Sequence, residues 1–125
     1  IAGQAAANRM SLGGGGSILF TGATASVKAR PPFIAFAAAK AALRAAAAGL
    51  AREFGPKGVH VGHVIIDGGV EGAIRRKRLP KEEDDAKENE LLNPTAIAET
   101  YWQLHLQHRS AWSFEIDLRP FNEVF

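Results

Sequence analysis

Four histidines are the residues most able to bind a metal in this sequence of 125 residues, which contains no cysteine and hence no disulfide or thiolate ligand. His60 and His63 fall in an apolar, β-branched run, where residues three apart point to opposite faces of a strand. His105 and His108 are spaced to share one helix face, but no carboxylate stands beside them at helical spacing. We therefore predict no metal site.

A hydroxyl nucleophile and a phosphate-binding loop are the next possibilities. Ser26 follows the apolar run SILFTG, where such residues often lie at the end of a strand, but the spacing supplies no base for it. The glycine run at 13–16 precedes that strand instead of following it, and it lacks the Gly-Lys-Ser/Thr ending of a P-loop. Neither pattern predicts catalysis or phosphate binding.

Lys40 is the most distinctive charged residue, because it lies in the alanine-rich stretch PPFIAFAAAKAALRAAAAGLAREFG. One interpretation is an exposed lysine on an amphipathic helix. The other is a functional cation, since the alanines at 37–39 and 41–42 are small enough to let a ligand or another helix approach closely. Residues alone leave both interpretations open.

An alternation of helices and strands must position these residues. The run at 59–66 is a β-branched, apolar strand, and the long helix before it carries an apolar stripe of Phe36, Leu43, Leu50 and Phe54. A strand, a long helix and a strand make a βαβ unit with parallel pairing and a right-handed crossover. The predicted elements of this α/β fold are helices at 1–10, 33–54 and 93–107, the last capped by Asn93 or Thr95, and strands at 17–21, 59–66 and 112–118.

The composition of the chain limits which kinds of molecule we expect it to bind. Hydrophobic residues make up 46% of the chain and charged residues 22%, with a net charge of +2, so we expect no nucleic-acid partner. The basic run RRKR at 75–78 is followed by a mostly acidic stretch, which indicates a solvated segment. No apolar stretch approaches the roughly 18 to 20 residues of a membrane span, and no signal peptide is visible, so we predict a cytoplasmic location and no membrane partner.

The succession of elements resembles the C-terminal half of the short-chain dehydrogenase/reductase family. A glycine-led strand ends in small and hydroxylated residues, SILFTGATAS, and is followed by a proline-rich loop, a helix bearing a lysine, and a strand ending in glycines. The resemblance covers residues 1–70 and, more loosely, 93–120. It implies a partial Rossmann-like three-layer fold, with 1–125 as a single domain that lacks the N-terminal nucleotide-binding half, upstream of Ile1.

In the family, a serine, a tyrosine thirteen residues later and a lysine four after the tyrosine form the catalytic set. Lys40 matches the lysine, whereas Phe36 stands at the tyrosine position and Ala23 at the serine position. The loss of both hydroxyls implies impaired proton transfer, a step that typically contributes about 10²–10⁴-fold in rate. Thr24 or Ser26 could replace the serine hydroxyl, but neither can imitate a phenol whose pKa a nearby lysine lowers.

The resemblance also implies a cofactor, NAD or NADP, with the nicotinamide side on this chain. Lys40 would hold the nicotinamide ribose, and Thr21, which ends the first strand, is a further cofactor-binding residue. In the loop after the second strand, Asp67 and Gly68 stand for the family's Pro-Gly pair and Val70 for the branched residue behind it. Counting from the strand start instead would put Ile66 and Asp67 at that pair. The residues that distinguish NAD from NADP, and those that bind the pyrophosphate, would lie upstream.

Two functions are compatible with these features. The first is an NAD(P)-dependent oxidoreductase of this family, divergent or truncated and impaired in catalysis. The second is a non-catalytic assembly protein that uses the family's helix surfaces. In that case the segments at 1–10 and 33–54 would contact a second copy or a partner subunit.

Overall fold

The computed structural model describes residues 2–72 and 91–123, and the basic run at 75–78 lies outside them. Each predicted helix and strand has its counterpart, and β2 has the predicted bounds. The helices are α1 (Ala2–Leu12), α2 (Ile34–Phe54) and α5 (Pro94–Leu106), the strands are β1 (Gly16–Thr21), β2 (Val59–Ile66) and β3 (Glu115–Leu118), and the short 3-10 turns are η1 (Thr24–Ser26), η2 (Gly55–Lys57) and η4 (Arg109–Ala111).

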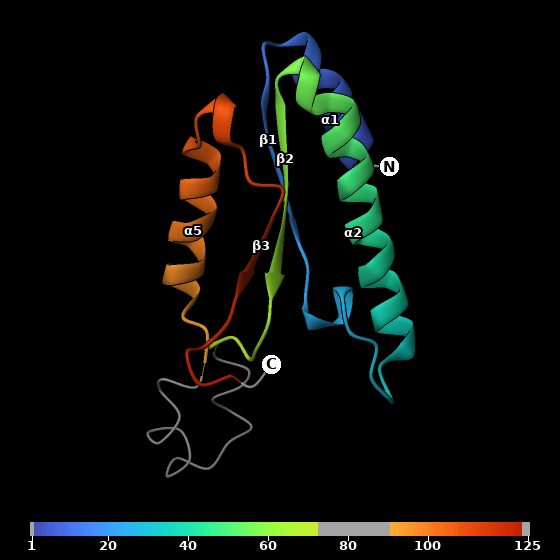
Figure 1. Cartoon of the computed structure of the whole chain (residues 1–125), viewed down its shortest axis with the longest axis vertical. Coiled ribbons are helices and arrows are strands. Elements are labelled where there is room, and N and C mark those ends of the chain that lie inside the picture. Colours follow the sequence, from blue (N-terminus) through green and yellow to red (C-terminus); the bar gives the residue numbers. More distant parts are fainter. Residues whose placement is uncertain (1, 73–90, 124–125) are drawn as a thin grey trace.

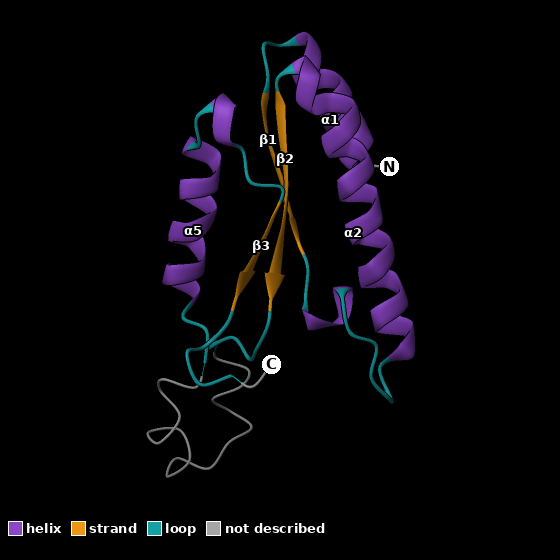
Figure 2. Cartoon of the chain, in the orientation of Figure 1, coloured by secondary structure: helices purple, strands orange, loops and turns teal. Residues whose placement is uncertain are grey.

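The three strands form a parallel sheet in the order β1-β2-β3 (Figure 1). Helices α1 and α2 cover one face of this sheet and α5 covers the other, which gives the predicted three layers (Figure 2). Parallel strands end at the same edge, so Thr21, Ile66 and Leu118 bring their following loops together there. That edge is where the family resemblance predicts the site.

The core lies between α1, α2 and the two longer strands. It is built from Ala7, Leu50, Phe54, Val59 and Val61, with Met10, Ile18, Phe20 and Ala51 packed against it. The predicted apolar stripe of α2 is therefore divided along its length. Leu50 and Phe54 are buried in the core, whereas Phe36 is half exposed at the other end of the helix.

The glycine run at 13–16 makes the tight turn from α1 into β1, at the amino end of the sheet. Gly15 has φ of 110° and a Cβ there would lie 2.4 Å from the carbonyl oxygen of Gly58, so only glycine fits. Arg109 donates from Nη2 to the Gly14 carbonyl at 3.3 Å and closes the same turn. The run serves the fold and lies at the opposite end of the strand from the predicted site.

The last strand begins at Glu115 instead of 112. Ser113 gives its backbone N–H to Oε1 of Gln107 at 2.7 Å, and its carbonyl contacts Nε2 of His60 at 2.8 Å. These side chains use the backbone N–H and carbonyl of Ser113, which a longer ladder would need. Asn93 is the cap of α5, because its Oδ1 accepts from the backbone N–H groups of Thr95 and Ala96.

The prediction that no apolar stretch approaches the length of a membrane span is wrong for α2. The helical stretch Ile34–Lys57 is long and apolar enough to cross a membrane by length and composition alone. Core helices of soluble proteins pass the same test, so this property is weak support for a membrane span.

Candidate active-site cleft

A cleft of about 580 Å³ opens at the carboxyl ends of β1 and β2, beside the first turns of α2. We call it the carboxyl-end cleft. Its volume lies in the range of small-molecule sites, roughly 300–1,000 Å³. It is lined by residues of the β1–α2 segment, of α2 itself and of the loop after β2: Thr21, Gly22, Ala23, Thr24, Ala25, Lys28, Arg30, Phe33, Phe36, Ala37, Lys40, Ile66, Gly68 and Val70.

Lys40 reaches this cleft from the second turn of α2. Its Nζ donates to the Thr21 carbonyl at 2.9 Å and lies 5.7 Å from the centroid of the Phe36 ring. The ammonium is thus held at the end of β1 by an exposed hydrogen bond. No carboxylate in residues 2–72 or 91–123 forms an ion pair with it.

The structure brings Ala23 and Phe36 to the same cleft as Lys40. Phe36 is 50% exposed, so its ring is a wall of the cleft and not part of the core. Neither side chain carries a hydroxyl that could transfer a proton.

The neighbouring hydroxyls are already engaged. The Ser26 side chain is buried, and its Oγ accepts from the backbone N–H of Ala23 at 3.1 Å. Thr24 lines the cleft, but its Oγ1 donates to Oδ1 of Asp67. Using the Thr24 hydroxyl as a proton donor in the cleft would require that bond to break.

The loop after β2 divides between two environments. Gly68 and Val70 line the cleft together with Ile66. Asp67 is buried and does not line it, because its carboxylate accepts from Thr24 and lies 3.5 Å from Nη2 of Arg119. Gly68 has φ of 149°, a backbone conformation that favours glycine.

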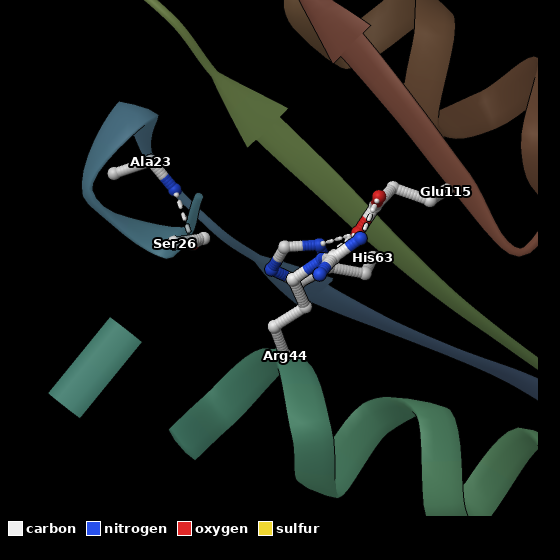
Figure 3. A network of polar contacts seen from close by, with 5 residues as sticks. All are labelled: Ala23, Ser26, Arg44, His63 and Glu115. Carbon is white, nitrogen blue, oxygen red and sulfur yellow. Dashed lines mark hydrogen bonds and ion pairs between the residues drawn. The ribbon is translucent and has the colours of Figure 1, made fainter. Parts of the chain in front are cut away.

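Behind the cleft, Arg44, Glu115 and His63 join α2, β3 and β2, and we call these residues the inter-strand network (Figure 3). Arg44 donates from Nε and Nη2 to the two carboxylate oxygens of Glu115 at 2.6 and 2.7 Å. Nδ1 of His63 donates to Oε2 of Glu115 at 2.9 Å. The hydrogen bonds from Arg44 are the main cause that lowers the pKa of Glu115; partial burial opposes it and the bond to His63 adds to it.

The sequence did not predict this network. Glu115 meets His63 because these two residues are paired in the register of β2 and β3. The only hint of the network in the sequence is the position of Arg44, one helical turn after Lys40 on α2. The Nε2 atom of His63 is buried without a hydrogen-bond partner among the described residues, and the ring is packed against Gly22 so closely that a Cβ at Gly22 would lie 2.4 Å from it.

Tyr101, the only tyrosine in the sequence, lies on α5 and does not line the carboxyl-end cleft. Its hydroxyl is 2.9 Å from Oγ1 of Thr21 and lines a second cavity of about 430 Å³. Thr21 therefore has two contacts, its carbonyl to Lys40 and its side chain to Tyr101.

The histidines occupy four separate environments. His60 stacks on Trp112 with ring centroids 4.8 Å apart, on the α5 side of the sheet, whereas His63 faces α2, so the predicted opposite faces are confirmed. The predicted shared helix face of His105 and His108 is wrong, because α5 ends at Leu106 and His108 caps η4. In the described part of the chain, no three His, Asp or Glu side chains form a group that could hold a metal.

A parallel sheet layered between helices, with a cleft at its carboxyl edge, is a portion of the Rossmann-like α/β class of fold. A family model for short chain dehydrogenases matches residues 1–83. The chain therefore belongs to the short-chain dehydrogenase family. Among curated proteins, no match was found.

Solved structures of similar fold agree with this assignment. The chain is 41% identical to a short-chain dehydrogenase from Rhodopseudomonas palustris, with a TM-score of 0.73, over 96% of this chain and 45% of that one. A short chain oxidoreductase from Pseudomonas aeruginosa PAO1 containing an atypical catalytic center has a TM-score of 0.69 at 22% identity, covering 86% and 47%. The closed form of a serine dehydrogenase complexed with NADP+ has a TM-score of 0.78 at 19% identity, covering 98% and 51%. The chain spans about half the length of these proteins.

Proposed function

We propose that this chain supplies the nicotinamide side of an NAD(P)-dependent oxidoreductase site, with the reacting groups in the carboxyl-end cleft. The observation that carries the proposal is the place of Lys40. Its ammonium is bonded to the last residue of β1, without a carboxylate partner among the described residues, on a cleft wall that also includes Phe36 and Ala23.

The donors in the cleft fit a nicotinamide nucleotide. Lys40 would bind the ribose hydroxyls, and the backbone at Gly68 and Val70 would face the nicotinamide. Solved proteins of the same fold contain NADP+ in one case and NADH in another. When bound, the cofactor supplies hydride transfer, and this chain contributes binding and orientation.

Proton transfer is the step in which this site is impaired. A carbonyl that receives a hydride also needs a proton at its oxygen, and a phenol beside an ammonium is suited to donate it. Phe36 preserves the ring without the phenol, and Ala23 removes the hydroxyl that would polarise the carbonyl. We therefore infer slow carbonyl reduction combined with retained cofactor binding.

Cofactor binding tests the proposal directly. Full-length protein is titrated with NADH and with NADPH while ligand fluorescence is followed. We expect binding at or below millimolar cofactor, weakened about tenfold or more by Lys40→Met, because one charged hydrogen bond contributes roughly 1.5–3 kcal/mol. Lys57→Met is the matched control, since Lys57 is exposed, pairs with Glu53 and lies far from the cleft. Absence of binding at millimolar concentration of both nucleotides would refute the proposal.

An assembly role is the second candidate, and the surface of α2 favours it. Only four of its 21 residues are buried, and much of the remaining surface is alanine. A groove of about 360 Å³ between α1 and α2 is lined in part by Gly3, Ala46 and Gly49, small residues that permit close helix approach.

Sedimentation of the full-length protein tests this second role. If α1 and α2 form an interface between copies, Ala46→Arg should shift the protein toward monomer, whereas Gln103→Arg on the exposed face of α5 should not. An unchanged mass with Ala46→Arg would oppose assembly through this surface. The cytoplasmic location and the absence of nucleic-acid and membrane partners stay predictions.

A further inference from the structure

We propose that the carboxyl-end cleft takes a substrate with an apolar body and an anionic end, a carboxylate in the simplest case, which Lys28 and Arg30 bind. This inference rests on the proposed function, because it names the substrate class of the same site. It follows from the distribution of charge around the cleft, from the apolar character of its walls and from the position of a helix start.

The first observation is the charge of the lining. Three of the nine described lysines and arginines line the cleft, namely Lys28, Arg30 and Lys40. No described aspartate or glutamate lines it. Such a cleft attracts anions, because its charged side chains are all positive and its apolar walls strengthen their electric field.

The second observation separates these cations from the others. Arg44, Lys57 and Arg119 each form an ion pair with a carboxylate. Lys28 and Arg30 are exposed and form no ion pair within residues 2–72 and 91–123. Lys40 is assigned to the cofactor, which leaves Lys28 and Arg30 as the charges available to a substrate.

The third observation is the start of α2. The backbone N–H groups of its first turn receive no side-chain cap from Phe33, and no acidic residue lies in that turn. Phe33, Phe36 and Ala37 line the cleft, so this helix start borders it. The partial positive charge of a helix N-terminus acts in the same direction as Lys28 and Arg30.

The walls determine the rest of the ligand. Apart from the three cations and the two threonines, the lining consists of glycine, alanine, phenylalanine and branched aliphatic residues. Burial of an aliphatic or aromatic body against them is favourable by roughly 25 cal/mol per Å² of apolar surface. An acid with a hydrocarbon chain satisfies both the walls and the charges.

The test compares three ligands that share one chain: octanoate, 1-octanol and octylammonium. Each is titrated calorimetrically into the full-length protein without cofactor at low ionic strength. We expect octanoate to bind at least tenfold more tightly than 1-octanol, and octylammonium to bind most weakly. Added salt should weaken octanoate binding and leave 1-octanol binding nearly unchanged, because salt screens exposed charges.

The double variant Lys28→Gln, Arg30→Gln should remove the preference for octanoate over 1-octanol. The matched control is Lys57→Gln, Arg52→Gln, which removes the same two charges from the last turn of α2 and from η2, far from the cleft, and should keep the preference. The inference is overturned if octanoate and 1-octanol bind equally, if none of the three ligands binds, or if both double variants lose the preference to the same extent.

The two proposals fail separately in this design. Retained octanoate preference without NADH or NADPH binding would refute the cofactor role and support the anionic ligand. Cofactor binding without any octanoate preference would refute the inference about substrate and support the cofactor role.

Discussion

Lys40 and Arg44 lie one turn apart on α2 and belong to different regions of the molecule. Arg44 forms two hydrogen bonds with Glu115, which also accepts from His63, so its charge is compensated inside the fold. Lys40 has one bond, to a backbone carbonyl, and lines a cleft. Arg44 is therefore paired with a carboxylate, whereas Lys40 has no carboxylate partner among the described residues and is available to a ligand.

The same contrast extends to the polar groups around these two cations. Beside Arg44, the Glu115 carboxylate accepts from Arg44 and from His63, and Nε2 of His63 is a buried atom without a partner among the described residues. Beside Lys40, Phe36 and Ala23 stand at the positions to which we propose to assign the family's proton-transfer hydroxyls. The inter-strand network therefore pairs the charge of Arg44 with a carboxylate, whereas the proposed assignment leaves Lys40 without the two hydroxyls that the family places beside it.

The largest effect should come from restoring hydroxyl groups at positions 36 and 23. In the full-length protein, Phe36→Tyr combined with Ala23→Ser should raise NADH- or NADPH-dependent reduction of a panel of aldehydes and ketones by about 10²–10⁴-fold, because general acid catalysis contributes that much. Cofactor absorbance measures the rate. Adding Lys40→Met to this double variant should abolish most of the gain. A double variant that binds cofactor and stays inactive would contradict the assignment of positions 36 and 23.

Mutations in the inter-strand network should change the stability of the protein and not its activity. Glu115→Ala leaves Nδ1 of His63, whose side chain is fully buried, without its acceptor. The expected loss is about 1–3 kcal/mol of unfolding free energy, the typical cost of an orphaned buried polar group. Chemical denaturation measures it. Glu53→Ala, at an exposed carboxylate 3.9 Å from Lys57, is the control and should change little. Equal stabilities of the two variants would show that the network contributes nothing.

Acid should weaken the inter-strand network. The pKa of Glu115 is lower in the folded protein than its ordinary value of 4.5, chiefly because of Arg44. Its stabilising contribution is therefore complete above about that pH and is lost as pH falls through the lowered pKa. Denaturation of wild type and Glu115→Gln should converge as pH is lowered, since glutamine resembles the protonated acid. A stability difference that is constant from about pH 7 to about pH 3 would exclude this linkage.

The sequence predicts most of the helices and strands but little of the inter-strand network. Gly and Pro residues mark the ends of α2, and the β-branched run defines β2, so the βαβ unit follows from local signals. The approach of Lys40, Phe36 and Ala23 to one cleft follows from the family spacing. The ion pair of Arg44 with Glu115 depends on how β3 aligns with β2, and no local pattern encodes that register.

Errors in the prediction occurred where side chains compete with regular structure. The spacing of His105 and His108 assumed a helix through both residues, but α5 stops at Leu106 and the Gln107 side chain turns to Ser113. Asp67, which the family alignment places in the cofactor loop, is a different case and not an error: its carboxylate accepts from Thr24 and lies 3.5 Å from Nη2 of Arg119. A role for Asp67 at the cofactor stays a prediction; its backbone N–H donates to the Leu118 carbonyl at 2.8 Å.

The smallest expected effect is on stability when Lys40 is replaced. Lys40→Met removes one exposed hydrogen bond and keeps the unbranched stem, so the unfolding free energy should change by no more than about 0.5 kcal/mol. Denaturation measures this change beside Glu115→Ala. Because the same variant is expected to weaken cofactor binding about tenfold, a loss of binding with unchanged stability would assign the cation to a ligand. A stability loss as large as that of Glu115→Ala would instead show that Lys40 stabilises the fold. The distinction between Arg44 as a structural cation and Lys40 as a ligand-binding cation would then be wrong.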